Sequence, residues 1–264
     1  MGKLEDGFRF TGKLGPYTAY KVKGSDEIFV KTRPGKSGKK LNDLSPRVKE
    51  NVTEFSLRST GSKAVRAAMK EILHLSDYNF TSDLNSRGRD TQLLDHVSAR
   101  GERGILISQH PQYYIGFNLN KRFLFDSIIR RPVRHTIDAS KRTATIDLPV
   151  LEPGISLLLS QPVATYRIIM VLGLAADQLF HTEARDRWFW GERVVVTTDP
   201  LLSGQVYPAQ QFELALPLPE KGPKDGTLSY VLSIGIEIEI ADMKKRKMVK
   251  TGSSKILDIV AAVV

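Results

Sequence analysis

Few residues in the chain have both the type and the spacing that chemistry requires. Gly35-Lys36-Ser37 matches the end of a phosphate-binding P-loop, but that motif needs another glycine five residues earlier, where Val30 stands. The chain has no cysteine, which excludes thiol catalysis and cysteine-ligated metal sites. Its five histidines are scattered, without an i, i+4 pair. The sequence therefore predicts no catalytic residue, no metal site and no cofactor.

Both tryptophans lie in an arginine-rich stretch, where Trp188 and Trp190 are two residues apart. On a strand the two rings would share a face. Exposed rings could stack on bases or sugars, with arginines nearby for phosphates. Buried rings would be core aromatics or would form a protein–protein contact. We favour burial or a protein contact, and we treat Trp188 and Trp190 as candidate interface residues.

Positive charge is concentrated towards the N-terminus. The net charge is +10, and the basic stretch from Lys31 to Lys49 contains a single acidic residue, Asp43. A basic arm of this kind suits an anionic partner such as nucleic acid, an acidic protein surface or lipid headgroups. The candidate contacts for an anionic partner are Lys31, Arg33, Lys36, Lys39, Lys40, Lys63, Arg66 and Lys70.

The elements that must position these residues begin with a helix after the basic arm. Ser45 is a favoured N-cap residue, and Pro46 fits the first helical position. Two apolar triplets follow at helical spacing, Val48-Val52-Phe55 and Val65-Met69-Ile72. On one straight helix the triplets would face different directions, and Gly61 lies between them. We therefore predict two helices, or one sharply kinked helix, broken near Gly61.

From Tyr113 onwards the sequence is typical of strands. The strongest signal is Ser229–Ile240, whose isoleucines face one way while Gly235, Glu237 and Glu239 face the other. An edge strand can add to a neighbour's sheet, so the predicted closing strand at residues 256–263 supplies two more candidate interface residues. These are Ile259 and Val263.

Short strands with Pro/Gly turns, and without helices of crossover length, favour an antiparallel sandwich. The predicted fold class is α+β: an N-terminal β-ribbon plus helices, followed by a mostly antiparallel β-sandwich, immunoglobulin-like or jelly-roll-like. The predicted divisions are a basic ribbon arm and loop at residues 1–44, a helical segment at 45–104 and a β-sandwich domain at 105–264.

Apolar runs in the chain fall far short of the ~20 residues that a membrane span requires. The N-terminal residues also lack the apolar stretch of a secretory signal. We therefore expect no transmembrane insertion and a protein that is cytoplasmic as synthesised.

Scattered short motifs resemble a known pattern. They are Arg47-x-x-x-Asn51-x-x-Glu54-Phe55 with Lys63 and Arg66, the Met-Gly-Lys start, Gly12-Lys13-x-Gly15-Pro16, Arg33-Pro34, Gly88-Arg89 and Gly116-Phe117-Asn118. Together they resemble a family of uncharacterised bacterial proteins of about this length, over roughly the first 120 residues. The resemblance implies a helical N-terminal half and a β-rich C-terminal half, and it implies no activity.

These observations predict a non-enzymatic structural or assembly protein. It would self-associate as a homo-oligomer, or dock on a larger particle, through its basic N-terminal arm and helices. The alternative is a nucleic-acid-binding protein that uses the basic arm, with an affinity that falls steeply with salt. A third possibility is a carbohydrate-binding or carbohydrate-active protein that uses the face of Trp188 and Trp190.

Overall fold

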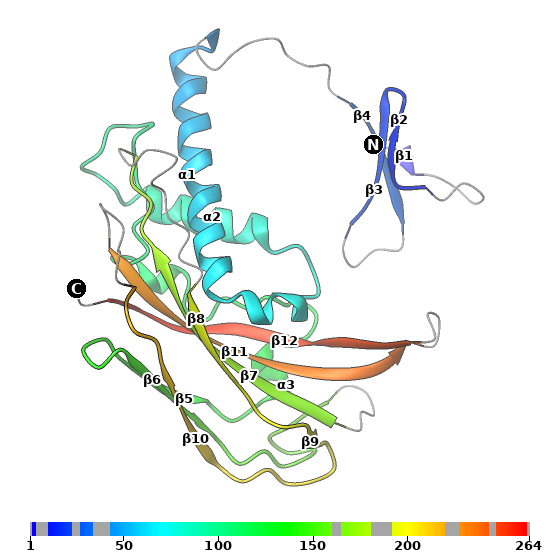
Figure 1. Cartoon of the computed structure of the whole chain (residues 1–264). Coiled ribbons are helices and arrows are strands. Elements are labelled where there is room, and N and C mark those ends of the chain that lie inside the picture. Colours follow the sequence, from blue (N-terminus) through cyan, green and yellow to red (C-terminus); the bar gives the residue numbers. More distant parts are fainter. Residues whose placement is uncertain are drawn as a thin grey trace.

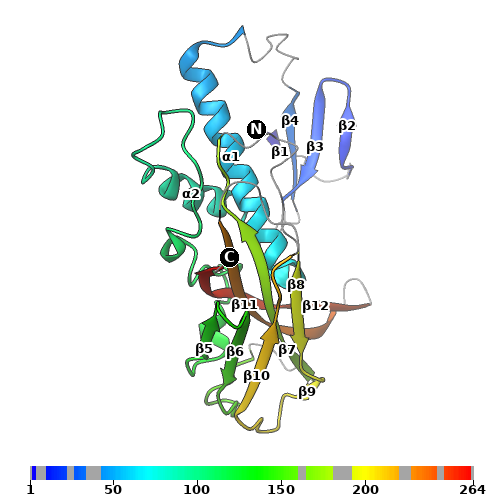
Figure 2. The same ribbon diagram turned by 60° about the vertical axis from the view of Figure 1, so that its left-hand side comes forward.

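Strands in three antiparallel sheets make up most of the regular structure (Figures 1 and 2). The structure is a computed structural model that describes residues 2–3, 10–22, 27–33, 43–159, 165–180, 192–219, 227–242 and 247–262. Lys36, Lys39, Lys40, Trp188, Trp190 and Val263 lie outside these ranges. None of the helices within them is long and apolar enough to cross a membrane.

Four short strands near the N-terminus form a ribbon in the order β1-β4-β3-β2. The strands are β1 (Gly2–Lys3), β2 (Gly12–Leu14), β3 (Tyr17–Lys21) and β4 (Ile28–Thr32). The β2–β3 turn contains Gly15, whose φ of 52° is accessible to glycine at little cost. Ala19 and Ile28 are the buried apolar side chains among its described residues. The ribbon therefore has little core of its own, and it lies to one side of α1 in Figure 1.

The largest sheet has the strand order β12-β11-β7-β8, with β9 pairing to β7. Its strands are β7 (Thr165–Ala176), β8 (Arg193–Thr197), β9 (Leu201–Leu202), β11 (Leu228–Asp242) and β12 (Lys247–Ala261). A smaller sheet, in the order β10-β6-β5, consists of β5 (Arg134–Asp138), β6 (Thr143–Leu148) and β10 (Gln210–Ala215).

The largest sheet is buried on both faces. On one face Ile168 and Met170 of β7 and Ile236 of β11 pack in one core with Ile146 of β6. On the other face, the alternate β7 residues join a second core. Side chains alternate between the faces of a strand, so burial on both faces explains the continuous apolar run of β7.

Helices cover the second face. They are α1 (Pro46–Ala68), the 3₁₀ helix η2 (Lys70–Leu75), α2 (Thr81–Gln92) and the 3₁₀ helix η3 (Pro111–Tyr113), whereas α3 (Phe125–Ile128) packs in the core on the first face. The end of α1 lies so close to β7 that a Cβ on Gly173 would be 2.1 Å from the Ala68 carbonyl oxygen. Under η2, a Cβ on Gly235 would be 2.6 Å from a methyl group of Leu75. The missing side chains of these two glycines allow the helices to sit on the sheet.

The predicted break near Gly61 is wrong, because α1 is continuous through that residue. Gly61 is buried, and a Cβ there would lie 3.0 Å from a methyl carbon of Ile105. The glycine therefore permits the side chain of Ile105 to approach α1 closely. The second apolar triplet is buried, whereas Val48, Val52 and Phe55 of the first are 42%, 43% and 57% exposed.

The predicted fold class is also wrong: the described structure is mostly β, and it is not a helical N-terminal half followed by a separate β-sandwich. Residues of the helical stretch, such as Leu57 and Val65, share one core with Val171 and Ile256 of the largest sheet. The smaller sheet covers the opposite face of the same sheet. The sequence interpretation failed because it treated helices and strands that share a core as consecutive units.

A loop covers part of the β12 edge of the largest sheet. The Gly116 N–H donates to the Ile256 carbonyl at 3.0 Å, and the Ile256 N–H donates to Phe117 at 3.0 Å. The Leu119 N–H donates to the Ser254 carbonyl at 2.9 Å. The loop thus satisfies backbone groups on the outer side of an edge strand.

Candidate functional site

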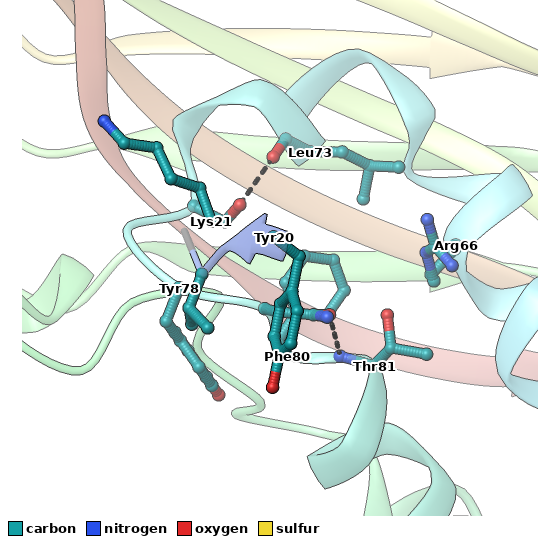
Figure 3. Close-up of a pocket in the computed structure, with 10 residues that line it drawn as sticks. Tyr20, Lys21, Arg66, Leu73, Tyr78, Phe80 and Thr81 are labelled. Carbon is teal, nitrogen blue, oxygen red and sulfur yellow. Dashed lines mark hydrogen bonds between the residues drawn. The ribbon is translucent and has the colours of Figure 1, made fainter. Parts of the chain in front are cut away.

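A cavity of about 490 Å³ lies where the ribbon meets the body. The ribbon contributes Tyr20, Lys21 and Val22 at the end of β3, and the body contributes residues from α1, η2 and the start of α2. Figure 3 shows Arg66 and Thr81 on one side of this cavity, and Tyr20 in front of the body residues. Two separately folded parts of the chain therefore form its wall.

Arg66 is a cationic side chain of this cavity whose hydrogen bonding differs from that of the other arginines of α1. Its Nε atom is buried and has no hydrogen-bond partner among the described residues. Its guanidinium carbon lies 5.9 Å from the centre of the Phe80 ring, in the range of a cation–π contact. Lys21 extends away from Arg66 in Figure 3. The cationic character near Phe80 therefore comes from Arg66.

Tyr78 lies on the side of the cavity away from Arg66 in Figure 3. The Tyr78 hydroxyl donates to Asp83 at 2.9 Å, and Lys121 lies 4.3 Å from the Tyr78 ring centre. Burial, together with the hydrogen bond to Asp83, raises the pKa of Tyr78 above its ordinary value. The Tyr78 side chain that lines the cavity is therefore neutral at physiological pH and is held by its hydrogen bond to Asp83.

The candidate contacts for an anionic partner are only partly brought together. Lys31 lies 5.3 Å from the centre of the Tyr20 ring, which itself lines the cavity. Arg66 lines it directly. Arg33, Lys63 and Lys70 are exposed. Lys36, Lys39 and Lys40 lie outside the described residues. Of the predicted contacts, two thus lie in or next to the cavity.

The candidate interface residues give a different result. Ile259 is 2% exposed and packs in the core beneath the helices, so its side chain is not available at the surface. Trp188, Trp190 and Val263 lie outside the described residues. The proposal that Trp188 and Trp190 form an interface stays a prediction.

A second surface feature is the outward face of α1, which we define by Val48, Val52 and Phe55. At about 100° per residue these side chains point roughly 160° away from the buried face that carries Leu57 and Ala64. Val48 and Arg66 are about five turns apart and so point the same way. Because Arg66 lines the cavity with the ribbon, the outward face lies on the ribbon side of α1.

Arginines around the N-terminal half of α1 share two carboxylates. Glu50 lies 3.5 Å from Arg47 and 3.3 Å from Arg100. The buried Glu54 lies 3.1 Å from Arg58 and accepts a hydrogen bond from the Gly101 N–H at 3.0 Å. Two arginines thus share each carboxylate, since Arg103 also lies 3.5 Å from Glu54, and none of these charges belongs to the outward face itself.

A third feature is the polar cluster around Glu237. This residue is 4% exposed and lies on the helix side of β11. Its carboxylate is bound by Arg167 of β7, by His74 of η2 at 2.7 Å and by Lys250 of β12 at 3.2 Å. Burial alone would raise the pKa of Glu237, but these three hydrogen bonds outweigh burial and hold the pKa below its ordinary value. A carboxylate with this many partners ties η2 to the sheet, and we assign it a structural role.

Sequence reasoning missed Tyr20, Tyr78 and Phe80 as cavity residues, because nothing in their spacing links β3 with the start of α2. It also placed Glu237 on a polar face without a partner. The sequence does show Glu237 as a carboxylate between alternating isoleucines. Its burial, however, depends on the helices that cover its face of β11.

Groups of three or more side chains able to hold a metal ion were not found within the described ranges. Comparisons of the chain with protein-family models, with curated proteins and with solved structures gave no match. The features of the described structure that bear on function are therefore the cavity and the outward face of α1.

Proposed function

We propose that this chain is a non-enzymatic assembly protein that self-associates through the outward face of α1 and the adjoining ribbon. The observation that carries this proposal is the exposure of Val48, Val52 and Phe55 on the side of α1 opposite its core. A grouped set of exposed apolar side chains on a folded chain is typical of an interaction surface. Isolated exposed apolar residues would not carry the same weight.

A second copy of the chain is the partner that fits this surface best. Arg47 and Arg58 of α1 already have acidic partners within the chain, so they would contribute little to a contact with a charged polymer. A stable interface buries about 800 Å² on each partner, more than three side chains supply. The ribbon provides further apolar surface, since Leu14, Tyr17 and Val22 are 58%, 49% and 43% exposed. The helix face and the ribbon together therefore form the proposed interface.

Light scattering on the nuclease-treated full chain tests this proposal. We expect a defined oligomer that persists at high salt, because burial of apolar surface is not screened by ions. The double variant Val52→Asp/Phe55→Asp should be a monomer with an unchanged melting temperature. Val97→Asp is the matched control, since Val97 is 99% exposed elsewhere, and it should remain an oligomer. A wild-type monomer at every concentration would contradict the proposal.

Nucleic-acid binding is the second candidate, because the side of α1 that carries the outward face continues into Lys63 and Arg66. Phosphate contacts would make the affinity fall steeply with salt concentration. Fluorescence anisotropy with single-stranded and duplex oligonucleotides measures this slope. Binding that disappears in Lys63→Gln/Arg66→Gln would favour this candidate over self-association.

A further inference from the structure

The cavity between the ribbon and the body has a wall composition that points to a ligand of a particular kind. Among the residues that the structure describes, two cationic side chains, Lys21 and Arg66, line it, and no carboxylate does. Three aromatic rings line it as well, from Tyr20, Tyr78 and Phe80. Its volume of about 490 Å³ suits a small organic molecule rather than a single ion.

Arg66 is the group that selects the charge of such a ligand. Other arginines near α1 have an acidic partner: Arg58 of α1 and Arg103 of the loop after α2 lie 3.1 Å and 3.5 Å from Glu54. Arg66 has no ion pair among the described residues, although its Nε is buried. A buried cationic donor without a partner costs free energy, and a bound anion would remove that cost. The guanidinium can bind a carboxylate or a phosphate through two parallel hydrogen bonds.

We propose that this cavity binds a small organic anion that carries an aromatic ring. The anionic group, a carboxylate or a phosphate, pairs with Arg66. The ring packs among Tyr20, Tyr78 and Phe80, which offer the faces and edges that aromatic groups prefer. Because Tyr20 belongs to the ribbon and the other groups belong to the body, the ligand bridges the two.

This site is distinct from the proposed self-association surface, although Val22 of the ribbon belongs to both, and the helix part of that surface lies farther from the cavity. Loss of ligand binding in an Arg66 variant that still forms the oligomer would separate the two proposals. Conversely, the Val52→Asp/Phe55→Asp variant should bind the ligand as the wild type does, because neither residue lines the cavity.

Isothermal titration calorimetry on the full chain tests the proposal with phenyl phosphate, inorganic phosphate and phenol as probes. Phenyl phosphate should bind, inorganic phosphate should bind at least tenfold more weakly, and phenol should give no heat. Arg66→Gln should weaken phenyl phosphate binding about tenfold or more, the usual effect of losing a charge-assisted hydrogen bond. Lys63→Gln is the matched control on an exposed neighbouring turn and should change the affinity less than twofold.

Tyr20→Ala provides a second variant, because Tyr20 lies in the ribbon outside both cores. It should weaken phenyl phosphate binding without changing the melting temperature, which keeps the test valid even if Arg66→Gln does not fold. The proposal is overturned if phenyl phosphate does not bind at millimolar concentration, or if Arg66→Gln and Tyr20→Ala bind it as the wild type does. Arg66-dependent binding of a single-stranded oligonucleotide far tighter than that of phenyl phosphate would also overturn it, in favour of a nucleic-acid path.

Discussion

In the C-terminal half of α1, Val65 and Ala68 are fully buried against the largest sheet, whereas in the N-terminal half Val52 and Phe55 are 43% and 57% exposed. Both halves have apolar residues at the same helical spacing. The two pairs lie on different sides of one continuous helix, and the side with Val65 and Ala68 is the one that faces β7, where Gly173 leaves room for it. Spacing thus specifies an apolar face on a helix, and the neighbouring strands determine whether that face is covered.

The largest effect is expected from a substitution that fills the space between β7 and the buried half of α1. Gly173→Leu has no room for its side chain, since even a Cβ would lie 2.1 Å from the Ala68 carbonyl oxygen. We expect the cooperative thermal transition followed by circular dichroism to be lost, because α1 must leave the sheet. Gly204→Leu is the control, since the space around Gly204 is open, and it should melt as the wild type does. A normal transition in Gly173→Leu would show that α1 does not depend on this contact.

A smaller effect is expected from two residues that are neighbours on α1. Leu57 is fully buried, so Leu57→Ala should lower the free energy of unfolding by about 2–5 kcal/mol. Phe55→Ala removes a larger side chain, yet it should change that free energy by less than about 0.5 kcal/mol under monomeric conditions. Urea unfolding measures both. An equal loss of unfolding free energy in the two variants would contradict the difference between the two faces, because it would mean that Phe55 packs in the core.

The third test concerns the attachment of η2, which follows α1 directly. A carboxylate whose folded-state pKa is depressed stabilises the protein above its unfolded pKa of about 4.3, and this stabilisation is lost as the pH falls through the folded-state pKa. At pH 7, Glu237→Gln should therefore lower the free energy of unfolding by about 1–3 kcal/mol. The difference from the wild type should shrink towards zero below about pH 4.

Urea unfolding at pH 7 and at pH 3 measures this difference. Glu239→Gln serves as the control, because Glu239 is 43% exposed and lies 3.9 Å from Lys250. It should have an effect below about 0.5 kcal/mol at both pH values. A difference for Glu237→Gln that stays constant with pH would mean that the charge of Glu237 does not fix η2 to the sheet.

Several local elements follow from the sequence. β5 and β6 form a hairpin around residues 139–142, and both its strand alternation and its turn residues can be found in consecutive positions. The isoleucines of β11 do share one face: Ile234, Ile236 and Ile238 pack in the core towards the smaller sheet. Such elements can be predicted from local periodicity, because the side chains of a strand alternate between its two faces along consecutive residues.

The arrangement of the elements could not be predicted in the same way. Gly61 was interpreted as a helix breaker, although it lies within α1 to admit Ile105, which is distant in the sequence. The cavity escaped prediction because Tyr20 and Arg66 belong to different parts of the chain and meet only in the folded structure. Of the candidate residues for an anionic partner, charge alone selected Arg66, and charge does not distinguish an enclosed guanidinium from an exposed one.

The loop at residues 116–119 has a consequence for how this protein fails when heated. Its hydrogen bonds occupy backbone groups of Ser254 and Ile256 along the outer side of β12. If the loop detaches before the rest of the chain unfolds, those groups become a template onto which strands of other molecules can add. Heat inactivation would then proceed through irreversible aggregation, and the apparent melting temperature would depend on the heating rate. In that case a short loop, rather than the core, would set the kinetic lifetime of the folded protein at high temperature.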